Sequence, residues 1–273
     1  MIQRKDPAGG GFDEDIPPNL GHTKSMQNRY VGDIGDFIKL ALLRTLQPGR
    51  RLGVAWWLFP DESHNSDGRH VSYIQKPTEW RALDPVLFDQ LAQIVASGTR
   101  HVSALQSAAL LPNTIFCDNV IPSGDNPARR RVNRGAWFEA VQKKLDDCDL
   151  VFVDPDNGLE TTSFSLGAVK AGKCVSLEQL RGLSRQGRTL VVYHHQTRRK
   201  GGHIAELAYW ADKLRAEGFG TVDAVRSSPF SPRAFFLLNA TPELRGLASH
   251  FSLQWGRWLS WHPDRFNPFS WLD

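Results

Sequence analysis

The sequence has no long hydrophobic run and contains few cysteines. None of its 273 residues lie in a segment that approaches the roughly 18 uninterrupted apolar residues of a membrane helix, so we expect no membrane span. The stretch MIQRKDPAGGGFDEDIPPNLGH has no apolar core, which argues against a secretory signal. The three cysteines, Cys117, Cys148 and Cys174, are widely spaced and odd in number, which argues against a disulfide framework or a zinc knuckle. Together these absences predict a cytoplasmic protein.

Acidic and basic residues are nearly balanced, but the basic ones are unevenly distributed. A formal charge of +4 permits an anionic partner without requiring one. Two local clusters, ARRRVNR and QTRRKGGH, could contact the phosphates of a nucleic acid or nucleotide, and a solvated loop is the alternative for each. The candidate phosphate-binding residues are Arg129, Arg130, Arg131, Arg198, Arg199 and Lys200. No pattern predicts an oligomeric state.

Strand and helix patterns alternate along most of the chain. Residues 1–25 are rich in Gly, Pro and Asp and predict a flexible arm, whereas 26–273 predict a single α/β domain with a Trp-rich, irregular C-terminal cap. Apolar spacing predicts a helix that begins near Asp33 or Asp36 and ends before Pro48. Further strands are predicted at 51–60, 114–117, 150–153, 189–196, 222–228 and 233–240, and helices at 85–96, 134–145, 177–186 and 203–218. The alternation favours a mostly parallel sheet covered on both faces, and the short PFSP connection predicts a terminal antiparallel pair.

Polar clusters follow three of the predicted strands. They are FPDESHNSDGRH after the strand at 51–60, DPDNGLE after 150–153, and HHQTRRKGGH at the end of 189–196. Ligands of open parallel sheets bind beyond the carboxyl ends of the strands. The three clusters therefore predict one functional site at this edge of the sheet.

The segment DPDNGLE concentrates acceptor groups directly after a buried strand. Asp154 is held extended by the proline that follows it, and could accept a hydrogen bond from a substrate amine or bind a divalent metal. Asp156, Asn157 and Glu160 could add oxygen ligands. A polar turn, in which these side chains bond to the backbone and Gly158 adopts a positive φ, is the alternative.

Two further patterns place polar residues near this site. His194 and His195 are adjacent in a strand and point to opposite faces, so one is buried and the other, a candidate proton carrier, faces the edge. In GDIGDFIK, the acids Asp33 and Asp36 and the base Lys39 lie one turn apart near a helix start. Capping explains one acid, and a lysine among apolar neighbours could also extend its ammonium to solvent.

This order of elements resembles the Rossmann-like S-adenosylmethionine-dependent methyltransferases. GDIGDFIK precedes the first strand, an Asp-Pro motif ends a middle strand, and an antiparallel pair closes the sheet. The chain is similar to the large-subunit ribosomal RNA adenine-N6 methyltransferases, which carry a Gly-x-x-x-Asp-x-x-Lys pattern and hold the target amine with an Asp-Pro-Pro-Tyr motif; Asp154-Pro155-Asp156-Asn157 stands at the corresponding place. It also looks like a group of uncharacterised bacterial proteins that share GDxGDFxK, DGR and DPDNGLE over about residues 29–240. The sequence departs from the methyltransferase pattern at Asn157, which replaces an aromatic residue, and after the first strand, where the only glycine, Gly68, comes late.

The resemblance implies a Rossmann-like three-layer sandwich and a methyltransferase-like enzyme that acts on nucleic acid or a nucleotide with S-adenosylmethionine. The catalytic residues would be Asp154, Asp156, Asn157, Glu160 and His195. The donor-binding residues would be Tyr30, Gly32, Asp33, Asp36, Lys39, Pro60 and Asp61.

Two other functions remain open from the sequence. In a nuclease or phosphohydrolase that depends on Mg²⁺ or Mn²⁺, the ion would lie among Asp154, Asp156 and Glu160, with His195 as proton carrier. A binding module that kept the fold without the chemistry would instead depend on the basic clusters.

Overall fold

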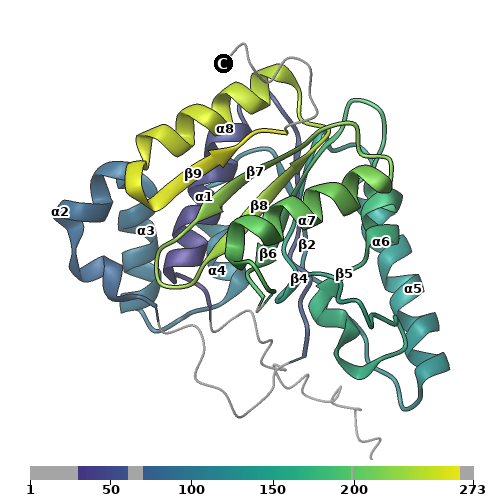
Figure 1. Cartoon of the computed structure of the whole chain (residues 1–273). Helices are drawn as coiled ribbons and strands as arrows, with labels where there is room; N and C mark the ends of the chain where they lie inside the picture. Colours follow the sequence, from purple (N-terminus) through teal and green to yellow (C-terminus); the bar gives the residue numbers. More distant parts are fainter. Residues whose placement is uncertain (1–29, 61–69, 198, 265–273) are drawn as a thin grey trace, which may run out of the picture.

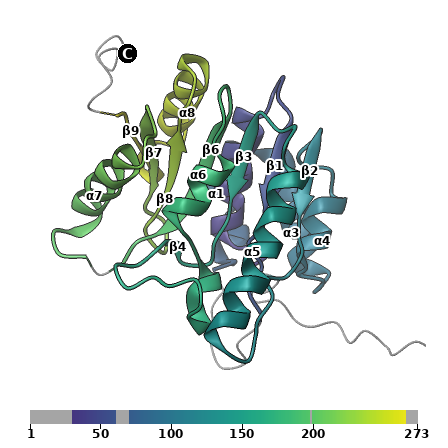
Figure 2. The same cartoon turned by 90° about the vertical axis from the view of Figure 1, so that its right-hand side faces the viewer.

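The computed structural model describes residues 30–60, 70–197 and 199–264, and its centre is a seven-stranded sheet with helices on both faces (Figures 1 and 2). In spatial order the strands are β2 (Thr114–Cys117), β1 (Leu52–Ala55), β3 (Leu150–Val153), β6 (Thr189–His195), β8 (Arg233–Leu238), β7 (Val222–Ser227) and β9 (Leu259–His262). The first four are parallel, whereas β8 runs antiparallel to both β6 and β7. The predicted α/β class, with a mostly parallel sheet and an antiparallel pair near its end, is confirmed.

Helices form a layer on each face of the sheet (Figure 2). One layer contains α1 (Ile34–Leu46), α3 (Pro85–Ala96), α4 (Val102–Ser107) and α8 (Pro242–Gln254). The other contains α5 (Pro127–Lys144), α6 (Leu177–Leu183) and α7 (Gly202–Ala216). Short helical segments are α2 (Pro77–Trp80), η2 (Ser72–Gln75), η3 (Arg81–Leu83), η4 (Val169–Lys173) and η5 (Gly256–Trp258).

Strand β3 shows why the central strands are apolar without interruption. Leu150 and Phe152 pack with the layer of α1, and Val151 and Val153 pack with the layer of α5 to α7. Successive side chains of a strand point to opposite faces, so a strand covered on both faces buries every residue. The strand therefore delivers Asp154 from the centre of the sheet to its edge.

Helix α1 begins where the sequence predicts. The carboxylate of Asp33 accepts a hydrogen bond from the backbone N–H of Asp36 at 3.0 Å, which is a standard N-cap. Almost the entire helix is buried, including Asp36 and Lys39. The predicted helix start is confirmed.

Three predicted boundaries are wrong for local reasons. Helix α5 begins at Pro127 rather than 134, because the side chain of Asn126 caps it by accepting from Arg129 N at 2.9 Å and proline suits the first helical position. Strand β1 ends at Ala55 rather than 60. Trp57 has a φ of 47°, which lies outside the β region, so the strand cannot continue through this residue. Helix α6 ends at Leu183, three residues before the predicted end.

The described part of the Trp-rich tail is more regular than the sequence predicts. Strand β9 pairs with β7, although an irregular cap is predicted there. The ring of Trp258 stacks on Trp80 with 4.6 Å between centroids, and Trp255 lies 5.3 Å from Phe37 of α1. The described part of the tail therefore packs on the α1 layer. The predicted N-terminal arm lies outside the described residues.

Within residues 30–60, 70–197 and 199–264, no helix is long and apolar enough to cross a membrane.

Candidate functional site

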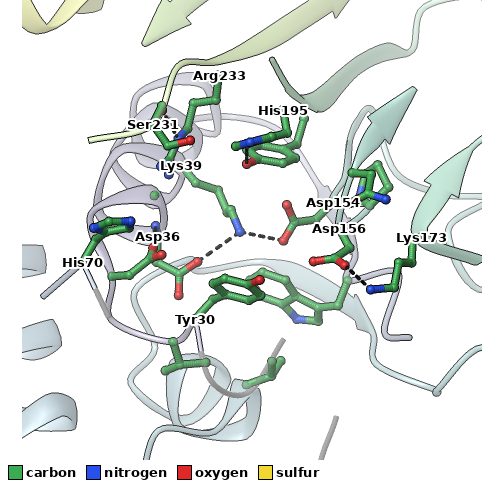
Figure 3. Close-up of a pocket in the computed structure, with 18 of the residues that line it drawn as sticks. Tyr30, Asp36, Lys39, His70, Asp154, Asp156, Lys173, His195, Ser231 and Arg233 are labelled. Atoms are coloured by element: carbon green, nitrogen blue, oxygen red, sulfur yellow. Dashed lines mark hydrogen bonds and ion pairs between the residues drawn. The ribbon is translucent and has the colours of Figure 1, made fainter. Parts of the chain in front are cut away.

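A cavity of about 430 Å³ opens at the carboxyl ends of β1, β3 and β6 (Figure 3). The start of α1, the end of each of these strands and the β7–β8 connection supply its walls. This is the edge of the sheet at which the polar clusters predict a site. Of the predicted residues, the cavity is lined by Tyr30, Asp33, Asp36, Lys39, Asp154, Asp156, Asn157 and His195.

The floor of the cavity is an ion-paired cluster of Asp36, Lys39 and Asp154, which we call the buried triad. The Lys39 ammonium lies 2.6 Å from Asp154 Oδ2 and 3.0 Å from Asp36 Oδ1 (Figure 3). Lys39 is 8% exposed and Asp154 is 4% exposed, so water screens neither contact strongly. Lys39 therefore connects α1 to the end of β3 through Asp154, and makes a second ion pair within α1 through Asp36.

Aromatic rings surround the lysine of the buried triad. The ammonium lies 5.5 Å from the ring centre of Trp56, 5.7 Å from that of Tyr193 and 6.0 Å from that of Phe152. Such distances allow the negative ring faces to stabilise a cation. The sequence-based alternative, in which Lys39 extends its ammonium to solvent, is wrong because the ammonium is enclosed by these rings and carboxylates.

Burial and charge act in opposite directions on the two ends of this ion pair. Burial alone would lower the pKa of Lys39, but Asp154 and Asp36 more than offset it, so that pKa lies above its usual value. Burial raises the pKa of Asp154 to about 6, although Lys39 acts in the opposite direction. Asp154 is therefore a carboxylate that can accept a proton near neutral pH.

The N-terminus of α1 brings two acidic side chains, Asp33 and Asp36, into the cavity wall. Asp36 Oδ2 accepts a hydrogen bond from the backbone N–H of Gly32 at 3.0 Å, so the carboxylate of Asp36 both braces the helix start and holds Lys39. Arg233 crosses Gly35 so closely that a Cβ there would collide with its guanidinium. Burial raises the pKa of Asp33, the neighbouring Asp36 raises it further, and Arg233 counteracts both. Gly35 thus leaves room for Arg233, whose positive charge partly offsets the negative charge of Asp33 and Asp36.

A second lysine, which the sequence analysis does not predict, faces Asp156. Lys173 Nζ lies 3.3 Å from Asp156 Oδ2 (Figure 3). The same ammonium lies 5.5 Å from the ring centre of Phe59. The backbone carbonyl of Lys173 also accepts from Asn157 N at 2.8 Å. A two-stranded parallel sheet of β4 (Gly158–Leu159) and β5 (Cys174–Val175) creates this proximity. Other lining residues that the sequence analysis misses are Trp56, His70, Ser231 and Arg233.

Glu160 does not belong to the cavity, which corrects its predicted role. Its Oε2 accepts a hydrogen bond from Leu177 N at 3.0 Å, at the start of α6. Asp154, Asp156 and Glu160 therefore do not surround one position. Across the described ranges, no group of three or more His, Cys, Asp or Glu side chains is arranged to hold a metal ion.

The two adjacent histidines face opposite sides of β6, as predicted. His195 lines the cavity, and its Nδ1 lies 3.5 Å from the hydroxyl of Tyr193. His194 is fully buried; its Nδ1 accepts from Leu159 N at 3.1 Å, so its Nε2 donates to Glu206 Oε1 at 3.1 Å. Gly158 has a φ of +91°, as the turn alternative requires, and a Cβ there would overlap His194. The turn after Asp154 is therefore seated on His194, which α7 holds in place.

The Glu206→Gln substitution tests how firmly this turn is anchored. Burial would raise the pKa of Glu206, but hydrogen bonds from His194 and Thr197 lower it to about 2. A lowered pKa stabilises the folded state above the unfolded value of about 4.5, and that contribution disappears as the pH falls toward 2. We expect the wild type to lose up to about 3 kcal/mol more stability than Glu206→Gln over this range. Denaturant titrations at several pH values measure it, and parallel pH profiles for the two proteins would contradict it.

None of the described residues of the two basic clusters lines the cavity. Arg130 donates to the carbonyls of Gly167 and Gly124 at 2.7 and 2.8 Å, and Arg131 donates to Ser165 Oγ at 3.3 Å. These contacts brace a loop, so Arg130 is not placed as the phosphate ligand that the sequence predicts. Arg199 stacks on Tyr209, 3.4 Å from its ring centre, whereas Arg129 and Lys200 are exposed and remain candidates.

Of the predicted donor-binding residues, Gly32 and Pro60 do not line the cavity. Asp61 and Arg198 lie outside the described residues.

Comparison with known proteins identifies no matching family model and no matching curated protein.

Proposed function

We propose that the protein is an S-adenosylmethionine-dependent methyltransferase that acts on an amine nitrogen of a nucleic acid base or nucleotide. The observation that carries the proposal is Asp154, a buried carboxylate at the end of β3 whose pKa is raised to about 6. The order of elements around it, with GDIGDFIK on the helix before β1 and an antiparallel β8 next to β6, supports the proposal because it is the order on which the methyltransferase resemblance rests.

The cavity suits a donor of this kind in size and charge. About 430 Å³ lies within the range of sites that hold small molecules. S-adenosylmethionine carries a sulfonium and an ammonium against a single carboxylate, so it is a net cation. The aromatic rings of Tyr30, Trp56 and Tyr193 and the nearby carboxylates favour such a group.

Asp154 would orient the acceptor amine and then take its proton. The donor would supply an electrophilic methyl group. Lys39 holds Asp154 Oδ2 and fixes the plane of the carboxylate, whose oxygens can each accept more than one hydrogen bond. The amine N–H donates to this carboxylate, which directs the nitrogen lone pair toward the methyl carbon. Methyl transfer would form an N–C bond to the acceptor amine and break the S–C bond of the donor, whose sulfur would keep the electron pair. Asp154 would then take the proton that the positively charged nitrogen loses.

Metal-dependent hydrolysis, the alternative from the sequence, has less support from the same side chains. Lys39 lies on Asp154 and Lys173 lies on Asp156, where a divalent cation would have to bind. Glu160, the third predicted ligand, caps α6 instead. We therefore favour methyl transfer.

Calorimetry with S-adenosylmethionine tests the proposal first. We expect micromolar binding, because charge and ring faces complement the donor, and weaker binding by a Tyr30→Ala variant, which removes one lining ring. A Tyr209→Ala variant, whose ring lies under Arg199 outside the cavity, serves as the control and should bind as the wild type does. An absence of heat at millimolar donor would exclude this function.

The pH dependence of methyl transfer tests the role of Asp154. Only the ionised carboxylate can accept the proton, so the initial rate should rise with pH and level off above about 6. Below that pH the rate should fall about tenfold per unit, because the fraction of ionised Asp154 falls in that proportion. Transfer of labelled methyl from the donor to a mixed RNA fraction measures it. A rate that is flat between about pH 5 and 7 would contradict the assignment.

A further inference from the structure

We infer that the cavity takes the nucleoside part of its substrate and keeps phosphate groups outside. This inference rests on the proposed function, because it names the part of the substrate that enters the same site. It is carried by the charges of the lining side chains and by the partners that the positive ones already have.

Acidic side chains are in excess among the described lining residues. The acidic groups Asp33, Asp36, Asp154 and Asp156 outnumber the lysine and arginine side chains, Lys39, Lys173 and Arg233, by one. A phosphate would bring further negative charge into a space that is poorly screened by water.

Each lining cation already lies close to a carboxylate. Lys39 contacts two of them at 2.6 and 3.0 Å, and Lys173 contacts Asp156 at 3.3 Å. Arg233 interacts with Asp33 electrostatically across Gly35. A phosphate could engage one of these cations only by competing with a carboxylate that geometry already holds there. Phosphate sites, in contrast, normally present cations in excess.

The uncharged parts of the lining fit a nucleoside. Asn157 and Ser231 offer polar groups to a base or ribose, and Asp154 offers an acceptor for an exocyclic amine. Exposed cations such as Arg129, Arg199 and Lys200 lie outside the cavity. The structure therefore separates the groups that suit a base from the groups that suit a phosphate.

Calorimetry with nucleosides and their 5′-monophosphates tests the inference on the full chain. The probes are adenosine, cytidine and guanosine, each of which carries an exocyclic amine, at a pH of about 8, where an unperturbed histidine is neutral. We expect at least one nucleoside to bind at least about tenfold more tightly than its monophosphate at low ionic strength.

An isosteric variant checks that charge is the cause. Asp156→Asn removes the carboxylate beside Lys173 and should reduce the preference for nucleoside about fivefold or more. Asp118→Asn, at an exposed carboxylate outside the cavity, is the matched control and should leave the preference unchanged. Equal effects of the two variants would count against the charge argument.

The outcomes separate this inference from the proposed function. Monophosphates that bind as tightly as nucleosides would overturn the inference. Binding of the donor without binding of any nucleoside at millimolar concentration would also overturn it, but leave methyl transfer standing. A clear preference for nucleosides without donor binding would support the inference and exclude the proposed function.

Discussion

Replacing Lys39 by methionine is expected to lower the free energy of unfolding by about 3–5 kcal/mol at pH 7. Methionine fills a similar volume, so the loss comes from charge: Asp36 and Asp154 would stay buried without the ammonium that lies 3.0 and 2.6 Å from them. The deficit should shrink as the pH falls, because Asp154, whose pKa burial raises to about 6, then takes up a proton and becomes neutral. Urea denaturation at two pH values measures both effects.

Two control variants identify the origin of this loss. Lys143→Met, at an exposed position of α5, should change stability by no more than about 0.5 kcal/mol. A triple variant with Lys39→Met, Asp36→Asn and Asp154→Asn should recover much of the loss, because no charge is then left unpaired. If Lys39→Met and Lys143→Met were equally stable, the buried triad would contribute nothing to folding.

Asp154→Asn is expected to reduce the rate of methyl transfer by about 10²- to 10⁴-fold. Asparagine keeps the shape of the side chain and an oxygen that can accept from Lys39, but it cannot take the proton of the acceptor amine. The donor should still bind within a few-fold of its wild-type affinity, which calorimetry can show on the same sample. The rise of the rate with pH should disappear as well, because it depends on this carboxyl.

Asp118→Asn is the matched control for this experiment. It changes an exposed carboxylate outside the cavity and should leave the rate unchanged. A rate for Asp154→Asn within about threefold of wild type would remove Asp154 from the mechanism, since a proton acceptor normally contributes far more.

Much of the fold could be predicted because its signals are local. The strands at 114–117 and 150–153 and the helix at 85–96 have the predicted bounds. Alternation alone placed His194 and His195 on opposite faces of β6. The location of the cavity followed from a general property of parallel sheets, because polar residues after three strands must meet where those strands end.

The connections within the site could not be predicted because they join distant parts of the chain. Lys39 and Asp154 are 115 positions apart, and no local pattern shows that they touch. Lys173 reaches Asp156 only because β4 and β5 pair, and each of those strands is two residues long. Glu160 looked like a site residue because it follows Asp154 closely, yet the turn directs it to the start of α6. Closeness in the sequence therefore assigned Glu160 to the site wrongly and gave no sign of Lys173.

The buried triad limits how this protein can tolerate mutation. Lys39 belongs to a helix whose other residues are mostly core, and Asp154 directly follows the buried strand β3. A substitution at either position alters both the folded state and the carboxylate that we propose as the proton acceptor. Under that proposal, selection for activity and selection for stability act on the same atoms. A substitution in the buried triad could be compensated only by simultaneous changes at 36, 39 and 154. Exposed positions such as Arg129 can change one at a time. We therefore expect substitutions to accumulate singly among the outer lining residues of the cavity. The three residues of the buried triad should change only together.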